Sequence, residues 1–324
     1  MFQFIIYLRA VCAVIITNAH YEEIYPISIV ANGGLLGDVL FFAISGYCLY
    51  NIKTDFVQWY GKRILRIYPE VWIITLIYLV LGFYSAGSIL EFVKLMIYPT
   101  YYHFVASIMI LYIIYYVLIC ILKKHNQNPA KLLKLYMITI LVIYIVVYLV
   151  VYDKSFYHID SVYEPVIRFL FLESMLLGAW FREKGMQVTQ KRPPHGWVAV
   201  LVCFVLYFAS KMVFSRYRIF ASYQILNQLL LFLLLFFVFK TFAGLEAEYK
   251  KLPKILQTLG KNISTITLEI YLVQYALIPR LNILRFPFNF IIVTVGIWGT
   301  AMALHWITDN MIVCVRKAFD RKEG

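Results

Sequence analysis

Charged residues are scarce in this chain of 324 residues: Asp, Glu, Lys and Arg make up 15% of it, against 62% hydrophobic residues. A soluble globular domain carries about 25% charged and about 45–50% apolar residues, so a soluble enzyme is a poor interpretation. The apolar residues suffice for about ten membrane-crossing helices of about 20 residues each. The composition therefore predicts an all-α, polytopic bundle of about ten transmembrane helices.

Several other features are missing from the sequence. The five cysteines are an odd number without CxxC spacing, and each falls in or beside an apolar run. This pattern indicates neither a disulfide framework nor a zinc site, and we expect no metal. The first apolar run has no small-residue cleavage site, which favours a retained helix. No repeat with a period of about 20–50 residues is present, so residues 1–324 are predicted to form one transmembrane domain.

Apolar windows separated by charged or Pro/Gly clusters predict the individual spans. The ten predicted spans are 5–24, 34–51, 69–86, 104–122, 134–152, 165–181, 197–214, 223–243, 263–280 and 288–308.

The basic residues are distributed unevenly between the connectors. Connectors after the even-numbered spans, with the C-terminal tail, hold 21 of the 30 Lys and Arg residues, whereas those after the odd-numbered spans hold 7. Because cytoplasmic loops carry the excess of Lys and Arg, both termini are predicted to be cytoplasmic. Topology and contact with anionic membrane lipids explain the net charge of +13. A nucleic-acid partner is not needed.

The first span contains two ionisable residues, which are costly in a membrane and mark a function or an internal pairing. Arg9 and His20 are eleven residues apart, so on a helix both project from one face, roughly 16 Å apart along the axis. A cation and a titratable base facing one lumen suit a reaction that crosses the bilayer. The alternative is that His20 merely sits at the membrane interface.

Further ionisable residues fall in spans 6, 9 and 10. Arg168 and Glu173 are about 140° apart on a helix and should pair with other spans. For these two residues and for Glu269, structural pairing is the favoured role, with substrate contact as the alternative. His305 and Asp309 are four residues apart and could bond each other.

Two short motifs follow in the first 70 residues. Span 2 contains F-F-A-I-S-G-Y, in which Ser45 and Gly46 would let another helix approach closely. A covalent role for Ser45 is a remote alternative, since no base neighbours it in sequence. After span 2 comes G-K-R-I-L-R-I-Y-P, in which Arg63 and Arg66 share a helical face beside Lys62.

Two guanidinium groups in this arrangement suit phosphate. The sharper interpretation is therefore a phosphate-rich cytoplasmic donor, such as a coenzyme A thioester. The alternative is ordinary positive-inside charge in contact with lipid headgroups.

Taken together, three elements carry a family resemblance: R-x10-H (Arg9, His20), F-F-x-x-S-G-Y (Phe41–Tyr47) and R-x-x-R-I-Y-P (Arg63–Pro69). With them the chain resembles the acyltransferase 3 family of integral membrane acyltransferases. Looser similarities follow at Tyr101–Tyr112, Arg168–Gly178 and Leu259–Gln274, so the resemblance runs along the whole chain. The ten predicted spans agree with the fold of that family, and no appended SGNH-type esterase domain is expected.

The resemblance implies an O-acyltransferase of the bacterial plasma membrane. Its donor would be acetyl-CoA bound on the cytoplasmic side, and its acceptor a carbohydrate or lipid-linked sugar of the cell envelope. Arg63 and Arg66, with Lys62, would bind the phosphates of coenzyme A. Arg9 and His20 would be catalytic, with His20 as the general base, because its ordinary pKa of about 6.5 lies near working pH. Direct transfer and an acyl-enzyme intermediate remain open alternatives, and the oligomeric state is not indicated.

Three positions depart from the family pattern. Gln274 stands where many relatives have His, so that position cannot act as a base. His103 stands where Trp is common, and packing is its favoured role. Asp38 is displaced by one residue from the usual acidic position, so no catalytic role is assigned to it. Tyr47 of the second motif is grouped with the substrate or structural residues.

Two other classes of function compete with the enzyme. A secondary transporter or a flippase for a lipid-linked or small polar substrate would also contain buried Arg, Glu and His. The chain, however, lacks matching Gly/Pro-broken spans in its two halves. A non-catalytic membrane scaffold would leave the intramembrane ionisable residues unexplained.

Overall fold

The computed structural model describes residues 2–98, 103–124, 128–151 and 166–320. Within these ranges the chain forms fourteen α-helices and two short 3₁₀ helices, and no strand. Six of the described helices are long and apolar enough to cross a membrane. The protein is therefore an all-α polytopic membrane protein, which confirms the fold class that the composition predicts.

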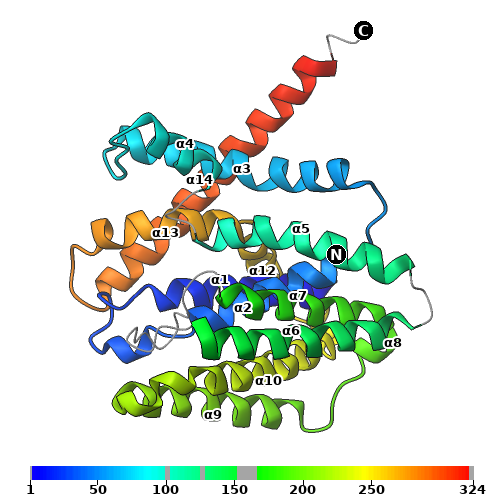
Figure 1. The fold of residues 1–324 in the computed structure, drawn as a ribbon. Coiled ribbons are helices and arrows are strands. Elements are labelled where there is room, and N and C mark those ends of the chain that lie inside the picture. The colour runs from blue at the N-terminus through cyan, green and yellow to red at the C-terminus, as the bar shows by residue number, and fades with distance from the viewer. Residues whose placement is uncertain (1, 99–102, 125–127, 152–165, 321–324) are drawn as a thin grey trace. The chain divides into compact units, whose positions relative to one another are not determined.

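The helices are distributed over the whole described chain (Figure 1). In chain order they are α1 (Gln3–Ala19), η1 (Ser28–Val30), α2 (Gly34–Leu49), α3 (Phe56–Val80), α4 (Ile89–Ile97), α5 (His103–Lys124), α6 (Pro129–Val151), α7 (Ile167–Glu183), α8 (Gly185–Thr189), α9 (Gly196–Arg216), η2 (Arg218–Tyr223), α10 (Gln224–Ala243), α11 (Glu246–Tyr249), α12 (Lys254–Thr265), α13 (Thr267–Leu281) and α14 (Phe288–Asp320).

Each of the ten predicted spans coincides with one helix, namely α1, α2, α3, α5, α6, α7, α9, α10, α13 and α14. The spans of α2, α5, α6, α9, α10 and α14 are the six that meet the length and hydropathy requirements, and α1 is a shorter apolar helix. Helix positions were therefore well predicted, whereas several helix ends differ.

The largest difference is at the start of α3, which begins at Phe56 rather than at residue 69. The carboxylate of Asp55 accepts a hydrogen bond of 2.9 Å from the backbone N–H of Gln58 and caps the helix. Hydropathy misses this first part because it is polar and basic. The Lys62–Arg66 segment is therefore the beginning of α3, not a separate connector.

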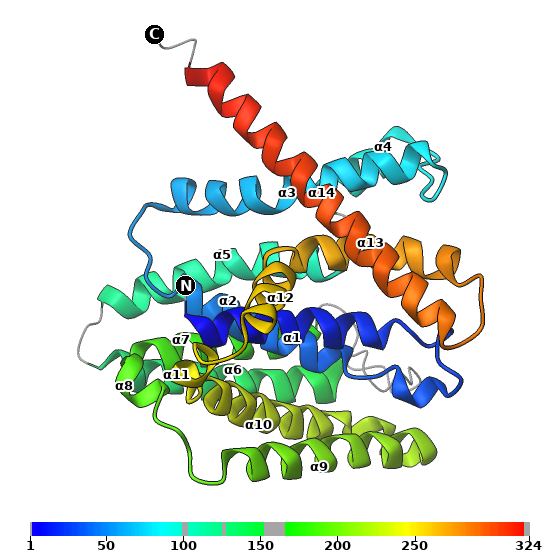
Figure 2. The ribbon, with the colours of Figure 1, turned by 180° about the vertical axis from the view of Figure 1, so that it is seen from behind.

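The helices form two compact units, each built from three stretches of chain. The first unit contains residues 1–12, 35–54 and 110–261, and the second unit contains residues 13–34, 55–109 and 262–324. In the first unit α6 packs on α7, and α9 runs beside α10 (Figures 1 and 2).

A close approach of α2 and α7 lies inside the first unit. A Cβ atom on Gly46 would come within 1.9 Å of the carbonyl oxygen of Met175, and one on Gly178 within 1.9 Å of the carbonyl oxygen of Ala43. Each helix thus offers a glycine to the backbone of the other, as small-residue contacts in membranes do. This confirms that Gly46 allows close helix approach.

The second unit is organised around α3, α13 and α14. Figure 2 shows α14 crossing α3 and α13, and all three helices contact one another. The hydroxyl of Tyr78 on α3 donates a hydrogen bond of 3.1 Å to the carbonyl oxygen of Val273 on α13. The C-terminal half of α1 belongs to the same unit, so this unit contains most of the residues considered next.

Candidate functional site

His20 lies just beyond the C-terminal end of α1, in a turn that runs to Ile24. Its backbone N–H donates a hydrogen bond of 3.0 Å to the carbonyl oxygen of Thr17, which continues the helix by one tightened turn. Because α1 ends at Ala19, Arg9 lies on this helix but His20 does not. The prediction that both residues lie on one regular helix is therefore wrong for His20.

The turn that holds His20 is fixed by the segment joining α13 to α14. The side-chain amide of Asn282 donates to the carbonyl oxygen of Glu23 at 3.1 Å, and that of Asn289 donates to the carbonyl oxygen of Ile24 at 3.0 Å. The buried Tyr21 shares a hydrogen bond of 3.0 Å with Thr294 on α14. The turn that carries His20 is therefore held in place by hydrogen bonds from side chains between α13 and α14 and on α14.

His20 lines a pocket of about 620 Å³ within the second unit, hereafter the His20 pocket. This volume is in the range of about 300–1,000 Å³ that is usual for ligand sites. Besides His20, its polar lining consists of Glu22, Glu23, Tyr84, Tyr275 and Arg280. Desolvation by the surrounding protein lowers the pKa of His20, and the negative charge of Glu22 opposes this shift. The neutral imidazole is thus favoured, which is the form that can accept a proton.

Arg280 supplies the positive charge of this pocket. Its guanidinium lies 3.8 Å from the centre of the Phe83 ring, a cation–π contact. Its Nη1 donates a hydrogen bond of 2.6 Å to the carbonyl oxygen of Ala276. Both contacts fix the guanidinium at the pocket wall, where it can face an oxyanion or an acidic ligand.

Gln274 connects α13 to the end of α1. The hydroxyl of Thr17 donates a hydrogen bond of 2.8 Å to the Oε1 atom of Gln274, and both side chains are buried. Thr17 also accepts the backbone hydrogen bond from His20. Gln274 cannot act as a base, as the sequence indicates, and its amide instead holds the helix end that presents His20.

The arginine pair Arg63 and Arg66 lies near the N-terminus of α3. Lys62 and Arg66 are exposed, and Arg63 is half-buried with its guanidinium 5.0 Å from the Trp59 ring centre. The exposed cations can meet a soluble ligand. The binding of phosphates by these residues stays a prediction.

The arginine pair and the His20 pocket lie at opposite ends of α3. Phe83 and Tyr84, which line the pocket, follow directly after the C-terminal end of this helix at Val80. At about 1.5 Å per residue, Arg66 and Val80 are roughly 21 Å apart along the axis. That distance is most of the hydrocarbon thickness of about 30 Å; the placement of the two ends of α3 on opposite sides of the membrane stays a prediction.

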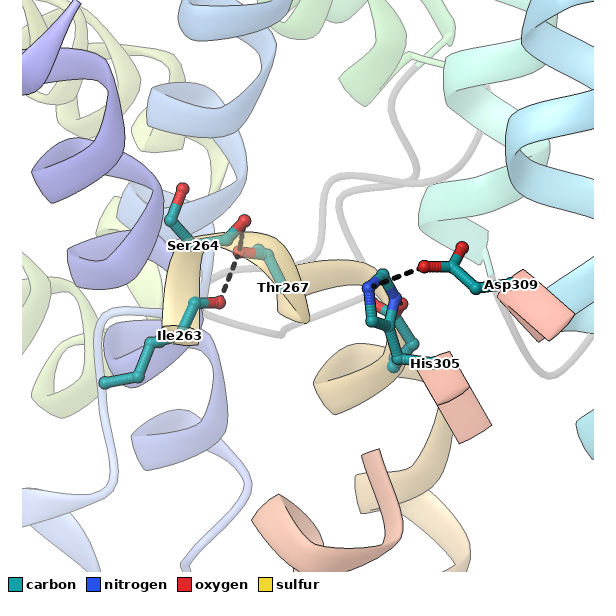
Figure 3. A network of polar contacts seen from close by, with 6 residues as sticks. Ile263, Ser264, Thr267, His305 and Asp309 are labelled. Atoms are coloured by element: carbon teal, nitrogen blue, oxygen red, sulfur yellow. Dashed lines mark hydrogen bonds and ion pairs between the residues drawn. The ribbon is translucent and has the colours of Figure 1, made fainter. Parts of the chain in front are cut away.

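A second polar cluster lies in the same unit, formed by Glu70 of α3, Glu269 of α13 and His305 of α14. The Nδ1 atom of His305 contacts a carboxylate oxygen of Glu269, and its Nε2 atom lies 3.4 Å from the Oδ2 atom of Asp309. Figure 3 shows the Asp309 carboxylate facing the imidazole ring. The predicted contact between His305 and Asp309 is confirmed. Glu269 has a partner on another helix, and its role stays a prediction.

Figure 3 also shows the junction between α12 and α13. The hydroxyl of Thr267 donates to the carbonyl oxygens of Ile263 at 3.0 Å and Ser264 at 3.1 Å. These bonds occupy carbonyl groups at the end of α12 while α13 begins. Glu269 then falls in the first turn of α13.

The remaining predicted residues fall mainly in the first unit. Arg9 lies on α1, and its charge and that of Asp38 both act on the buried thiol of Cys12. Arg9 and His20 therefore belong to different units, and their opening onto one passage stays a prediction.

Tyr47 and Ser45 occupy structural positions on α2. The Nη1 atom of Arg182 donates a hydrogen bond of 3.3 Å to the Tyr47 hydroxyl, and the guanidinium lies 5.1 Å from the centre of the ring. Ser45 is buried, next to Gly46 at the contact with α7. These contacts favour packing over substrate binding for both residues.

Glu173 is buried on α7 and lines a cavity of about 20 Å³ with Tyr144 and Gln228, room for about one water molecule. It shares this cavity with residues of α6 and α10, but its Oε1 atom is buried without a hydrogen-bond partner among the described residues, so its pairing with other spans stays a prediction. Arg168 is half-buried on the same helix. His103 begins α5, but its side chain lies outside the described part of the chain.

Comparison with known families decides the class of the protein. The acyltransferase domain model of the acyltransferase 3 family matches residues 2–308, nearly the whole chain. The chain belongs to the acyltransferase 3 family. No curated protein and no solved structure matches it. This member of the family is a membrane acyltransferase, which the match favours over a transporter, a flippase or a scaffold.

The sequence interpretation of this acyltransferase missed two groups of residues. Phe83, Tyr275 and Arg280 belong to the His20 pocket, but Phe83 is far in the chain from the two residues of α13, and no local pattern marks them. Glu70 was detectable, because it is a carboxylate at the second position of a predicted span, one helical turn after Arg66.

Proposed function

We propose that this acyltransferase moves an acetyl group from cytoplasmic acetyl-CoA to a hydroxyl of a cell-envelope carbohydrate or lipid-linked sugar, in the bacterial plasma membrane. The observation that carries the proposal is the arrangement along α3, with exposed cations near its N-terminus and a pocket containing His20 after its C-terminus. Such an arrangement would suit a donor and an acceptor on opposite sides of a membrane.

The donor would bind at the arginine pair. Guanidinium groups one turn apart match phosphate oxygens in geometry and charge, and Lys62 adds a third cation on the same helix. Arg66 and Val80 lie roughly 21 Å apart along α3. The long arm of the coenzyme would therefore run along the bundle and carry the thioester toward His20.

His20 would be the general base of the transfer. The acceptor hydroxyl gives its proton to the neutral imidazole as its oxygen attacks the thioester carbonyl carbon. The carbon–sulfur bond breaks, the acyl group remains on the acceptor oxygen, and the coenzyme leaves as its thiol after it receives a proton. Arg9 would bind the donor or stabilise the charge that develops on the thioester carbonyl oxygen.

The lining of the His20 pocket supports a sugar acceptor. Tyr84 and Tyr275 offer aromatic faces and hydroxyl groups, and Glu22 and Glu23 offer carboxylates that accept hydrogen bonds from sugar hydroxyls. A few polar groups on a partly aromatic wall are usual for a small-molecule site.

Mass analysis of envelope glycans tests this function. Cells that lack the protein should lose one acyl mass increment from a surface glycan or lipid-linked sugar. Wild-type protein and the Arg285→Ala variant, which removes an exposed cation outside the pocket and the arginine pair, should restore that increment, whereas His20→Ala should not. Unchanged glycans in cells that lack the protein would contradict the proposal.

A further inference from the structure

The cluster of Glu70, Glu269 and His305 is not used by the proposed transfer. One ligand atom from each residue lies within 4.8 Å of the others. Glu70 is 9% exposed and Glu269 is 1% exposed. Two carboxylates from α3 and α13 thus face each other away from water, which requires either a shared proton or a bound cation.

The state of the Glu70 carboxylate points to a ligand. Its Oε2 atom is buried and has no hydrogen-bond partner among the described residues. A buried carboxylate oxygen without a donor is costly. A cation held between the carboxylates would satisfy this atom together with those of Glu269.

The imidazole of His305 lies between two carboxylates. Its Nδ1 atom faces Glu269 inside the cluster, and its Nε2 atom faces the Asp309 carboxylate at 3.4 Å. A ligating histidine usually donates its other ring N–H to a carboxylate, which fixes its tautomer. Asp309 would then act as a positioning residue for the imidazole.

Charge and access agree with a divalent ion. Arg66 acts electrostatically on Glu70, so three carboxylates and one guanidinium surround the cluster and sum to −2 when all are ionised. The side chains of His305 and Asp309 are 28% and 65% exposed, so protein does not close the cluster on the side of α14.

We infer that Glu70, Glu269 and His305 bind a divalent cation of the zinc or manganese class, which links α3, α13 and α14. One imidazole and two carboxylates suit these ions. Ligands of one tetrahedral zinc ion, bound at about 2.0–2.2 Å, are roughly 3.5 Å apart, so side-chain movements of about 1 Å complete the site. The sequence analysis expects no metal, and the ligands proposed here could not be recognised there because they come from three helices distant in the chain.

Metal binding by the purified full-length protein, freed of any polyhistidine tag, tests this inference. After chelation and dialysis, the protein should take up one equivalent of Zn²⁺ by elemental analysis. Co²⁺ should give the visible absorption of a ligand field with nitrogen and oxygen donors. Zn²⁺ should also raise the unfolding temperature.

Three variants complete the experiment. Glu269→Gln should abolish uptake, and Asp309→Asn, an exposed substitution compatible with folding, should weaken Zn²⁺ binding by about 10–100-fold. Glu173→Gln removes a buried carboxylate outside the cluster and should bind as the wild type does. Absence of uptake by the wild type, or unchanged affinity in Asp309→Asn, overturns the proposal and leaves a proton shared by the two carboxylates.

Discussion

The hydroxyl of Thr17 donates a hydrogen bond to Gln274, and thereby joins the last turn of α1 to the middle of α13. Thr17 also accepts the backbone hydrogen bond from His20. The amide of Gln274 therefore supports the residue that we propose as the base, at a position where many relatives have a histidine.

Thr17→Val should destabilise the protein and lower the transfer rate. The substitution leaves the Gln274 oxygen buried without its donor, which costs about 1–3 kcal/mol, and loosens the helix end before His20. Thermal unfolding in detergent and acyl transfer measure the two effects. Thr75→Val is the matched control, because the buried Thr75 hydroxyl has no hydrogen-bond partner in the described ranges. Equal unfolding temperatures for the two variants would contradict the role of this bond.

His20→Ala should lower acyl transfer by about 10²–10⁴-fold, the usual contribution of a general base. Donor binding should remain close to that of the wild type, since the arginine pair lies at the other end of α3. Calorimetric titration with acetyl-CoA and a transfer assay separate the two quantities. A variant with normal turnover refutes the assignment of His20.

The fall of the transfer rate at low pH should follow the protonation of His20. Desolvation lowers its pKa, so in the wild type the rate should fall only as pH drops below the ordinary value of about 6.5. Glu22→Gln removes the charge that opposes this shift, so the fall should move further toward low pH. Glu23→Gln should move it less. If the rate of Glu22→Gln fell at a higher pH than that of the wild type, the prediction would be wrong.

Arg63→Ala/Arg66→Ala should weaken acetyl-CoA binding, and binding to the wild type should weaken as salt rises. Exposed charges are screened over about 10 Å at 0.1 M and about 3 Å at 1 M ionic strength. Titrations at both concentrations measure the effect, with Arg285→Ala as the control. Affinity that does not respond to salt would remove the phosphate role of the pair.

Gly46→Ala should prevent the close packing of α2 on α7. The added methyl group would meet a backbone oxygen, which no side-chain rotation can relieve, and overpacking costs about 1–3 kcal/mol or more. Gly61→Ala on α3 meets nothing within 4 Å and should be neutral or stabilising, by up to about 1 kcal/mol. Size-exclusion profiles and unfolding temperatures distinguish the two variants.

The positions of the helices could be predicted because each apolar run had to become one helix in lipid. Their ends could not, since these depend on local hydrogen bonds that hydropathy does not detect. Asp55 caps α3 well before its apolar part, and α1 stops at Ala19 before the anchored turn of His20.

The candidate site was predictable where its residues are neighbours in sequence. The arginine pair is such a case, and so is the pairing of His305 with Asp309 along α14. Contacts between distant helices were not predictable, as Arg280 on Phe83 and Glu269 against His305 show. One chain without aligned relatives carries no signal for them.

The interleaving of the two units has a consequence for biosynthesis. His20 is among the first residues made, but Tyr275 and Arg280 of its pocket are made near the end of the chain. At about 5–20 residues per second, the ribosome needs tens of seconds to supply them. During this time the nascent turn after α1 must wait in the translocation machinery or the lipid, and no C-terminal truncation that removes α13 can retain an assembled His20 pocket.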